Sequence, residues 1–200
     1  VISFTQLIEQ AYFGQVSLSS TGFYRTPKIF YDREKASGTP FYYYSFGMSC
    51  SEVIIDTLTG EYKVLRTDIL HDVGDSLNPR IDIGQIEGGF IQGMGWMTME
   101  DLQYNNEGQL MSNTLSTYKI PDIYSVPKTV TIEPLDTDGN DMAILKSKAV
   151  GEPPLMYGIG AYFAIENAIK SFNPIFNSTF DAPFTHEKVL MGLYGPFNSE

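Results

Sequence analysis

The sequence is poor in the residues that form disulfides or bind metal ions. Cys50 is the only cysteine in 200 residues, so no internal disulfide can form, which fits a reducing compartment. The two histidines, His71 and His186, lie far from Cys50 in the chain, and no metal-ligand spacing appears. We therefore expect no metal ion held by protein ligands, and a cytoplasmic protein.

Basic residues and long apolar runs are also scarce. Lysine and arginine number 13 against 24 acidic residues, a net charge of −11, so no basic surface is available to replace the counterions of a nucleic acid. No apolar run approaches the roughly 18 residues that a membrane span needs, and no signal-peptide pattern opens the sequence. We expect neither a nucleic acid nor a membrane among the partners.

What the sequence does contain is typical of a globular protein. Apolar residues make up 42% and aromatic residues 14%, which supports a sizeable core in one domain over residues 1–200. Possible subdivisions lie near residues 75–80 and 135–145. The sequence has no initiator methionine, and residues 1–13 have a helical pattern from the start. We therefore expect a fragment, or a processed subunit, of a longer protein.

Alternating and aromatic patterns predict several strands. Residues 41–55 and 61–72 flank a turn and form a hairpin, whose first strand is expected to be buried on both faces in its middle. Cys50 would then be a buried small apolar residue. Further strands are predicted at 129–132 and 142–150, the latter after an acidic turn at 136–141. A last helix is predicted over 185–194, with Thr185 as its N-cap.

A second helix is unusually rich in glycine. Apolar side chains recur at helical spacing between residues 83 and 102, and the same stretch holds glycines at 84, 88, 89, 93 and 95. Each glycine costs about 1 kcal/mol against alanine in an exposed helix. Such a sequence indicates the close approach of another backbone or of a ligand. Ordinary packing of one helix on another explains the glycines equally well.

A single carboxylate stands before two prolines and a third predicted helix. Glu152 precedes Pro153 and Pro154, and residues 155–172 have helical apolar spacing. Proline is tolerated in the first turn, so Glu152 is expected at the entrance of the helix, where the helix dipole favours a charged carboxylate. In a partly buried site this is a suitable general base. The alternative interpretation is an ordinary capping acid.

The segment Lys-Ala-Val-Gly-Glu-Pro-Pro-Leu at 148–155, with the helix after it, resembles the xanthine dehydrogenase members of the xanthine oxidase family of molybdenum hydroxylases. The resemblance runs from about residue 22 to about residue 193. Near the end, Pro183-Phe184-Thr185-His186 departs from the family's Pro-Ala-Thr-Pro, away from the chemistry. Other matching segments are 21–24, 50–56, 73–79, 83–93, 116–121 and 181–191.

The resemblance implies an α+β fold, the C-terminal portion of a molybdenum-cofactor-binding domain, with mixed sheets and packed helices. It implies that Glu152 is the catalytic base beside the molybdenum and that Gln85 contacts the molybdopterin. The side-chain amide of Gln85 offers both a donor and an acceptor to such a cofactor. In the family the molybdenum ion has no protein ligand, so Gln85 and Glu152 are the expected cofactor-binding residues.

The resemblance also implies parts that this sequence lacks. The family's 2Fe-2S motifs, its FAD domain and the first half of the molybdenum domain are absent, so the isolated chain is expected to be inactive. The complete assembly is expected to be a dimer that hydroxylates hypoxanthine and xanthine to urate, with water as oxygen source and NAD as acceptor. The alternatives are a sibling aldehyde oxidase or N-heterocycle hydroxylase, and a non-catalytic relic or interaction module.

Overall fold

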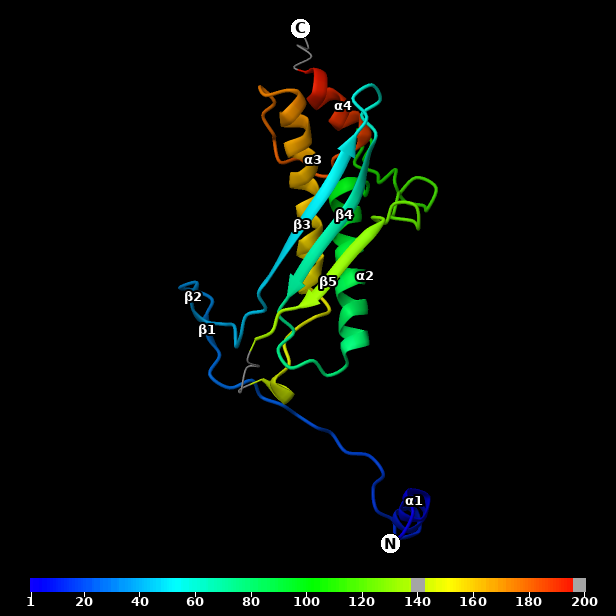
Figure 1. Cartoon of the computed structure of the whole chain (residues 1–200). Coiled ribbons are helices and arrows are strands. Elements are labelled where there is room, and N and C mark those ends of the chain that lie inside the picture. The colour runs from blue at the N-terminus through cyan, green and yellow to red at the C-terminus, as the bar shows by residue number, and fades with distance from the viewer. Residues whose placement is uncertain (138–142, 196–200) are drawn as a thin grey trace. The chain divides into compact units, whose positions relative to one another are not determined.

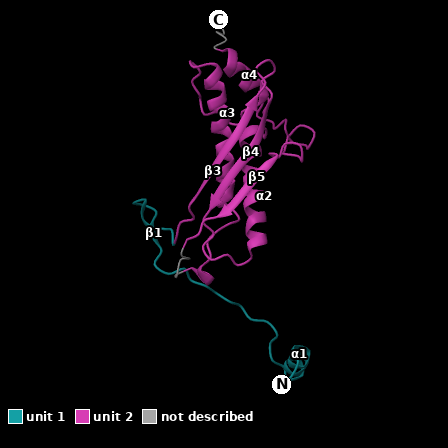
Figure 2. Ribbon diagram, in the orientation of Figure 1, with its two compact units in different colours: residues 1–42 teal, residues 43–200 magenta. Residues whose placement is uncertain are grey.

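The computed structural model describes residues 1–137 and 143–195, which form parts of two compact units (Figure 2). The first unit comprises residues 1–42 and the second residues 43–200. The subdivisions expected near 75–80 and 135–145 remain predictions.

The first unit contains one helix and one small hairpin. Helix α1 (Phe4–Phe13) begins with a capping box in which Ser3 and Gln6 exchange side-chain and backbone hydrogen bonds. Strands β1 (Phe30–Asp32) and β2 (Ser37–Thr39) pair antiparallel. No residue of α1 is buried within the described part of the chain, although one side of the helix is apolar.

The second unit is built on a mixed three-stranded sheet in the order β3-β4-β5. Strand β3 (Gly47–Ile55) pairs antiparallel with β4 (Tyr62–His71), as the predicted hairpin requires. Strand β5 (Thr129–Pro134) then pairs parallel with β4, which needs a crossover connection. The crossover contains helix α2 (Pro79–Thr98), and α2 and α3 (Ile159–Phe172) lie together on one side of the sheet (Figure 1). The expected α+β class is confirmed.

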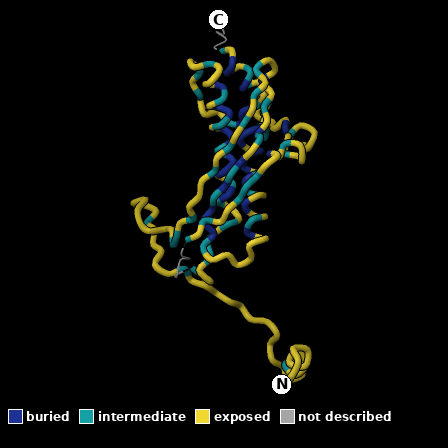
Figure 3. Tube along the Cα trace, viewed as in Figure 1, coloured by how far each residue is buried: buried dark blue, intermediate teal, exposed yellow. Residues whose placement is uncertain are grey.

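The core lies between the sheet and these two helices, along the dark blue stretch of the tube in Figure 3. One group of buried side chains joins β4, α2 and the start of α3: Val64, Ile69, Val73, Ile86, Phe90, Met94, Tyr157 and Ala161. A second group joins the end of α2 to α3 and α4 (His186–Tyr194): Met97, Tyr162, Ile165, Ile169, Phe184, Val189 and Leu193. Helix α2 contributes to both groups, so it ties the two halves of this core together.

The expectation for β3 was wrong. Its residues alternate between exposed and half-buried because β3 is an edge strand and helices cover only one face of the sheet. Cys50 lies on the uncovered face and is exposed, not buried. The aromatic and β-branched composition correctly predicted a strand, but composition does not tell how many faces of a strand are covered.

Two other predicted elements also differ from the structure. Residues 143–150 form no strand; they hold a short 3-10 helix, η1 (Ile144–Lys146), in which Leu145 and Lys146 have positive φ angles. Two successive residues in that region cannot continue an extended strand. Met142 and most of the predicted acidic turn lie outside the described residues. The glycine-rich helix was predicted over 83–102; α2 starts and ends four residues earlier, capped by the Asn78 side chain.

Helix α4 starts as predicted, because the Thr185 side chain accepts a hydrogen bond from the Lys188 amide at 3.3 Å. Thr185→Ala should destabilise α4 by about 1 kcal/mol, because the amide loses its capping acceptor. Faster hydrogen exchange of the α4 amides would report this loss. Thr185→Ser, which keeps the hydroxyl, should behave like the wild type. Equal exchange in all three proteins would contradict the capping role.

Candidate functional site

The candidate site is organised by a close crossing of α2 with η2 (Pro153–Gly158), the 3-10 helix that follows Glu152. A Cβ atom at Gly93 would lie 1.9 Å from the carbonyl oxygen of Leu155, and one at Gly158 would lie 2.1 Å from the Gly93 carbonyl carbon. Neither space admits a side chain, because both contacts are with backbone. At Gly93 the glycine is explained by the close packing of a second helical segment, whose backbone approaches α2 directly.

Two other glycines of α2 lie beside open space and not against another segment. A Cβ atom at Gly84 or Gly88 would meet nothing within 4 Å, so this part of the helix borders open space among the described residues. Gln85 lies in the same exposed stretch. A Cβ atom at Gly151 would be 3.4 Å from Gln85 Oε1. The fold thus brings the Gln85 amide beside the residue that precedes Glu152.

Glu152 itself lies at the surface and not in a partly buried position. Its side chain makes no capping hydrogen bond, so the interpretation of an ordinary capping acid is wrong. The α-helix begins only at Ile159, not at residue 155, because η2 comes first; its prolines lack amide hydrogens and it packs closely on α2. Within residues 1–137 and 143–195, no hydrogen bond or ion pair occupies the side chains of Gln85 and Glu152.

A buried carboxylate holds the segment that leads to Glu152. Asp72, at the end of β4, is fully buried and forms an ion pair with Lys148, whose side chain is only 10% exposed. Asp72 also accepts hydrogen bonds from the Thr137 hydroxyl at 2.8 Å and the Gly74 amide at 3.0 Å. In addition, the Lys148 amide donates to the Val73 carbonyl at 2.8 Å. The segment before Glu152 is therefore fastened to the end of the central strand.

Both ionisable residues at the end of β4 have shifted pKa values. Burial lowers the pKa of His71 below 6.5, although the Ala149 carbonyl and the charges of Asp72 and Asp82 act against this shift. Burial alone would raise the pKa of Asp72, but hydrogen bonds from Lys148, Thr137 and Gly74 together lower it below 3.8. The folded protein thus keeps His71 neutral and Asp72 charged.

These shifts predict how stability depends on pH. Below about pH 6.5 the unfolded chain binds a proton at His71 more readily than the folded chain, so stability should fall as the pH falls towards the lower folded pKa. A further loss should follow below about pH 3.8, where an unfolded aspartate takes up a proton that folded Asp72 resists. Thermal unfolding midpoints measured between about pH 8 and about pH 3, a range that contains the unperturbed pKa values of histidine and aspartate, would show both losses of stability. His71→Gln, which cannot titrate, should lose only the first step; an unchanged profile would contradict the assignment to His71.

Cation binding by side chains finds no support in the described residues. No group of three or more histidine, cysteine, aspartate or glutamate side chains gathers there in a way that could hold a metal ion. His71 is occupied by hydrogen bonds, and His186 packs edge-on against the Tyr62 ring. Among the same residues, no helix is both long and apolar enough to cross a membrane.

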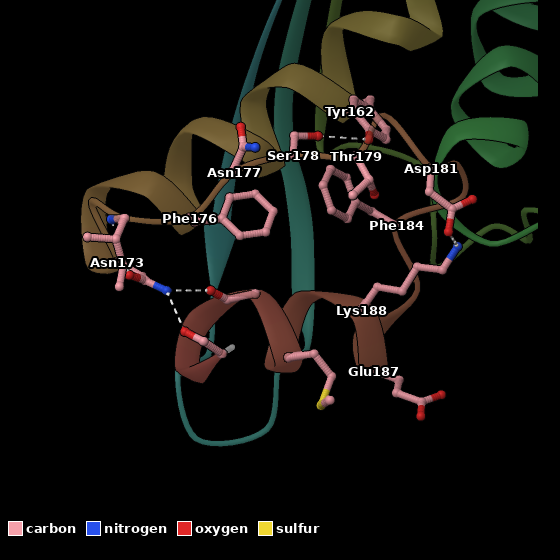
Figure 4. A pocket seen from close by; sticks show the side chains of 14 residues that line it. Tyr162, Asn173, Phe176, Asn177, Ser178, Thr179, Asp181, Phe184, Glu187 and Lys188 are labelled. Carbon is pink, nitrogen blue, oxygen red and sulfur yellow. Dashed lines mark hydrogen bonds and ion pairs between the residues drawn. The ribbon is translucent and has the colours of Figure 1, made fainter. Parts of the chain in front are cut away.

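A separate pocket of about 640 Å³ lies between α3, α4 and the loop that joins them (Figure 4). Tyr162 and Phe184 stack at its side with ring centroids 4.3 Å apart, and Lys188 pairs with Asp181 at 2.8 Å. Neither Gln85 nor Glu152 lines it. Figure 1 places α4 at one end of the sheet and the segment before η2 at the other, so this pocket is not part of the candidate site.

Comparison with known proteins identifies the family of this chain. The model of a family described as a molybdopterin cofactor-binding domain matches residues 1–127, a range that includes Gln85. The chain belongs to this family. Glu152 lies beyond the matched range.

Curated relatives extend the similarity over nearly the whole chain. The chain is 48% identical to xanthine dehydrogenase/oxidase of Mus musculus over 98% of its length, and 53% identical to that of Felis catus over 84%. It is 45% identical to aldehyde oxidase 2 of Macaca fascicularis over 95%. The chain spans only 15%, 12% and 14% of these three relatives. The resemblance to the xanthine oxidase family is confirmed.

Solved structures agree with this placement. Aldehyde oxidoreductase from Desulfovibrio gigas superposes with a TM-score of 0.74 at 27% identity, over 92% of this chain and 19% of that one. Quinoline 2-oxidoreductase from Pseudomonas putida 86 gives 0.63 at 29% identity, over 70% of this chain and 17% of that one. The molybdopterin-binding fold is thus shared with enzymes whose names indicate different substrates.

Sequence reasoning missed the residues that hold the Glu152 segment. His71 and Asp72 end a strand and carried no motif of their own, and Lys148 entered only as part of the resemblance. A polar pair directly after the apolar residues Ile69 and Leu70 at the end of β4 was the available signal. Its partners could not be predicted, because they come from residues far along the chain.

Proposed function

We propose that this chain is the C-terminal part of the molybdenum-binding domain of an enzyme that hydroxylates a purine. In this proposal the complete enzyme converts hypoxanthine and xanthine to urate, with water as the source of oxygen. The observation that supports it most is the meeting of Gln85 with the Gly151-Glu152 pair at one exposed edge. Both side chains are free of hydrogen bonds with the described residues, so one can bind a cofactor and the other can accept a proton.

The residues present fit a molybdopterin cofactor. The Gln85 amide offers a donor and an acceptor, and Gly84 and Gly88 leave open space on the same helix. When bound, a molybdenum–molybdopterin group supplies two-electron oxidation and delivery of an oxygen atom that originates from water. Gln85 would hold the pterin edge through its amide, and Glu152 would lie beside the reacting atoms.

The role of Glu152 follows from its free carboxylate. A carboxylate that accepts no protein hydrogen bond can take a proton directly from the attacking oxygen, as a general base must. The carboxylate projects from the segment between Lys148 and η2, both of which are attached to the core. Glu152 is therefore presented on a supported backbone while its side chain remains available.

The rest of the active enzyme lies in other parts of the protein. The chain spans about 15% of the length of its relatives. We therefore propose that the complete enzyme also contains the first half of the molybdenum domain and the 2Fe-2S and FAD parts. In this proposal it uses NAD as acceptor and forms a dimer in the cytoplasm. Exposed apolar side chains suit the docking of such parts. Between residues 110 and 126 they include Leu115, Ile120, Ile123 and Tyr124.

A sibling activity is the second candidate. The 45% identity to an aldehyde oxidase is close to the 48% identity to a xanthine dehydrogenase/oxidase, so this region of the enzyme does not separate the two substrates. A non-catalytic relic is the third candidate. The free side chains of Gln85 and Glu152, together with the position of Gln85 beside Gly151, favour an enzyme over a relic.

Elemental analysis of the natively purified complete protein, with its intact mass, tests the proposal. We expect near-stoichiometric molybdenum and turnover of xanthine and hypoxanthine. Turnover of an aromatic aldehyde or of quinoline, with none of purines, would move the assignment to a sibling enzyme. A complete, folded protein without molybdenum would identify the relic.

A further inference from the structure

One buried imidazole contacts the chain on both sides of Glu152. His71 is 0% exposed, and its Nε2 atom lies 3.1 Å from the Ala149 carbonyl oxygen. Its Nδ1 atom forms a hydrogen bond with the Tyr157 hydroxyl. Ala149 precedes Glu152 by three residues and Tyr157 follows it by five. His71 therefore connects the two ends of the segment that carries Glu152.

The two contacts determine which nitrogen carries the proton. A carbonyl oxygen can only accept, so Nε2 of His71 must donate to Ala149. In the neutral ring Nδ1 is then an acceptor, and the Tyr157 hydroxyl donates to it. Neutral His71 satisfies both contacts at once. Burial, which lowers the pKa of His71, favours this same neutral form.

The surrounding residues hold both partners of His71 in place. The Ser45 hydroxyl donates to the Ala149 carbonyl at 3.2 Å, and the Ser49 hydroxyl donates to the Tyr157 carbonyl at 3.0 Å. The Tyr157 hydroxyl lies over Gly47, where a Cβ atom would be only 1.7 Å away. Gly47 is paired across the sheet with His71. The hydroxyl thus occupies a space that exists only because residue 47 is glycine.

We propose that His71 is a positioning residue for Glu152. It acts through the backbone: it holds the chain at Ala149 and Tyr157, and so limits where the carboxylate between them can lie. This inference rests on the proposed role of Glu152 as base. It adds that the position of the Glu152 carboxylate depends on the hydrogen bond between His71 and Tyr157.

The test uses Tyr157→Phe in the complete, molybdenum-loaded enzyme. The variant keeps the ring and removes only the hydroxyl that donates to His71. We expect hydrogen exchange at the amides of residues 149–157 to become about tenfold faster, as loss of one buried hydrogen bond implies. We expect kcat to fall about tenfold with KM and molybdenum content unchanged, because only the transition-state geometry suffers.

Tyr62→Phe is the matched control. Tyr62 is half-buried against the core, and its hydroxyl donates a shared hydrogen bond to the carbonyls of Thr98 and Phe184 at 2.8 and 2.7 Å. Its loss should lower the thermal unfolding midpoint but leave both the exchange at 149–157 and kcat at wild-type values. A role in stability alone would make the two variants equivalent, which would overturn the proposal.

Variants of the histidine provide a second comparison. The amide of His71→Gln can still donate to Ala149 and accept from Tyr157, whereas His71→Leu can do neither. We expect the glutamine variant to retain more kcat and slower exchange than the leucine variant. Equal values in the two variants would contradict positioning through hydrogen bonds, even if Tyr157→Phe failed to fold.

The outcomes separate this inference from the function on which it rests. If Glu152→Gln is inactive while Tyr157→Phe keeps wild-type exchange and kcat, positioning by His71 is wrong and the proposed base stands. If Glu152→Gln remains active, the proposed base is wrong. The positioning of a base would then be wrong as well, and faster exchange in Tyr157→Phe would show only that the hydrogen bond stabilises the backbone.

Discussion

Glu152→Gln in the complete enzyme should lower turnover by roughly a hundredfold to ten-thousandfold, the range that a positioned general base contributes. The amide has almost the same size as the carboxylate but cannot accept the proton from the attacking oxygen. Because the Glu152 side chain makes no hydrogen bond with the described residues, the change should leave the fold intact. Molybdenum content should equal that of the wild type. Steady-state kinetics together with elemental analysis would measure both quantities.

Glu187→Gln is a suitable control for this experiment. Glu187 is also exposed, but it lies in the first turn of α4, away from η2. The same chemical change there should leave turnover unaltered. Normal turnover of Glu152→Gln would refute its role as the base. Loss of molybdenum in that variant would instead show that Glu152 acts in binding the cofactor.

Gly93→Ala should produce the largest loss of stability of any single methyl group added to α2. The new Cβ atom would lie 1.9 Å from the Leu155 carbonyl oxygen, so α2 and η2 must separate. Forced overpacking of this kind costs about 3 kcal/mol, and more where backbone must move. Because η2 directly follows Glu152, turnover should fall as well. The thermal unfolding midpoint and kcat of the complete enzyme would test both effects.

Gly88→Ala on the same helix is the matched comparison. A Cβ atom there meets nothing within 4 Å among the described residues, so the alanine should gain about 1 kcal/mol from helix propensity. The two substitutions are chemically identical and differ only in what the methyl group meets. If both raised the unfolding midpoint, the close crossing of α2 and η2 would be disproved. If Gly88→Ala lowered cofactor content without lowering the midpoint, the open space at Gly88 would belong to the cofactor.

Local patterns predicted most of the second unit's elements. The hairpin of β3 and β4, strand β5, α2 and the Thr185 cap all follow from periodicity or capping chemistry within a few residues. The failures have long-range causes. The exposure of Cys50 depends on which face of the sheet the helices cover. The positive φ angles of Leu145 and Lys146 could not be predicted, because leucine and lysine do not favour such angles.

The candidate site was only partly accessible to sequence reasoning. Residue spacing alone did not decide whether Glu152 is a general base or a capping acid. Nor did it decide whether the glycines of α2 allow the approach of a backbone or ligand or only the packing of another helix. The resemblance to a family, not the pattern, selected Gln85 and Glu152. That these two lie together depends on the backbone contact at Gly93, which joins segments far apart in the sequence.

The close contact between α2 and η2 also has a mechanical consequence. Since backbone meets backbone at Gly93 and Gly158, no flexible side chain lies between the two segments to absorb a displacement. The backbone of α2, which carries Gln85, and the backbone of η2, which directly follows Glu152, should then move as one piece. Under the proposed roles of Gln85 and Glu152, assembly of the complete enzyme would align this single stiff piece with the remaining polypeptide, with the spacing between the two backbone segments already set.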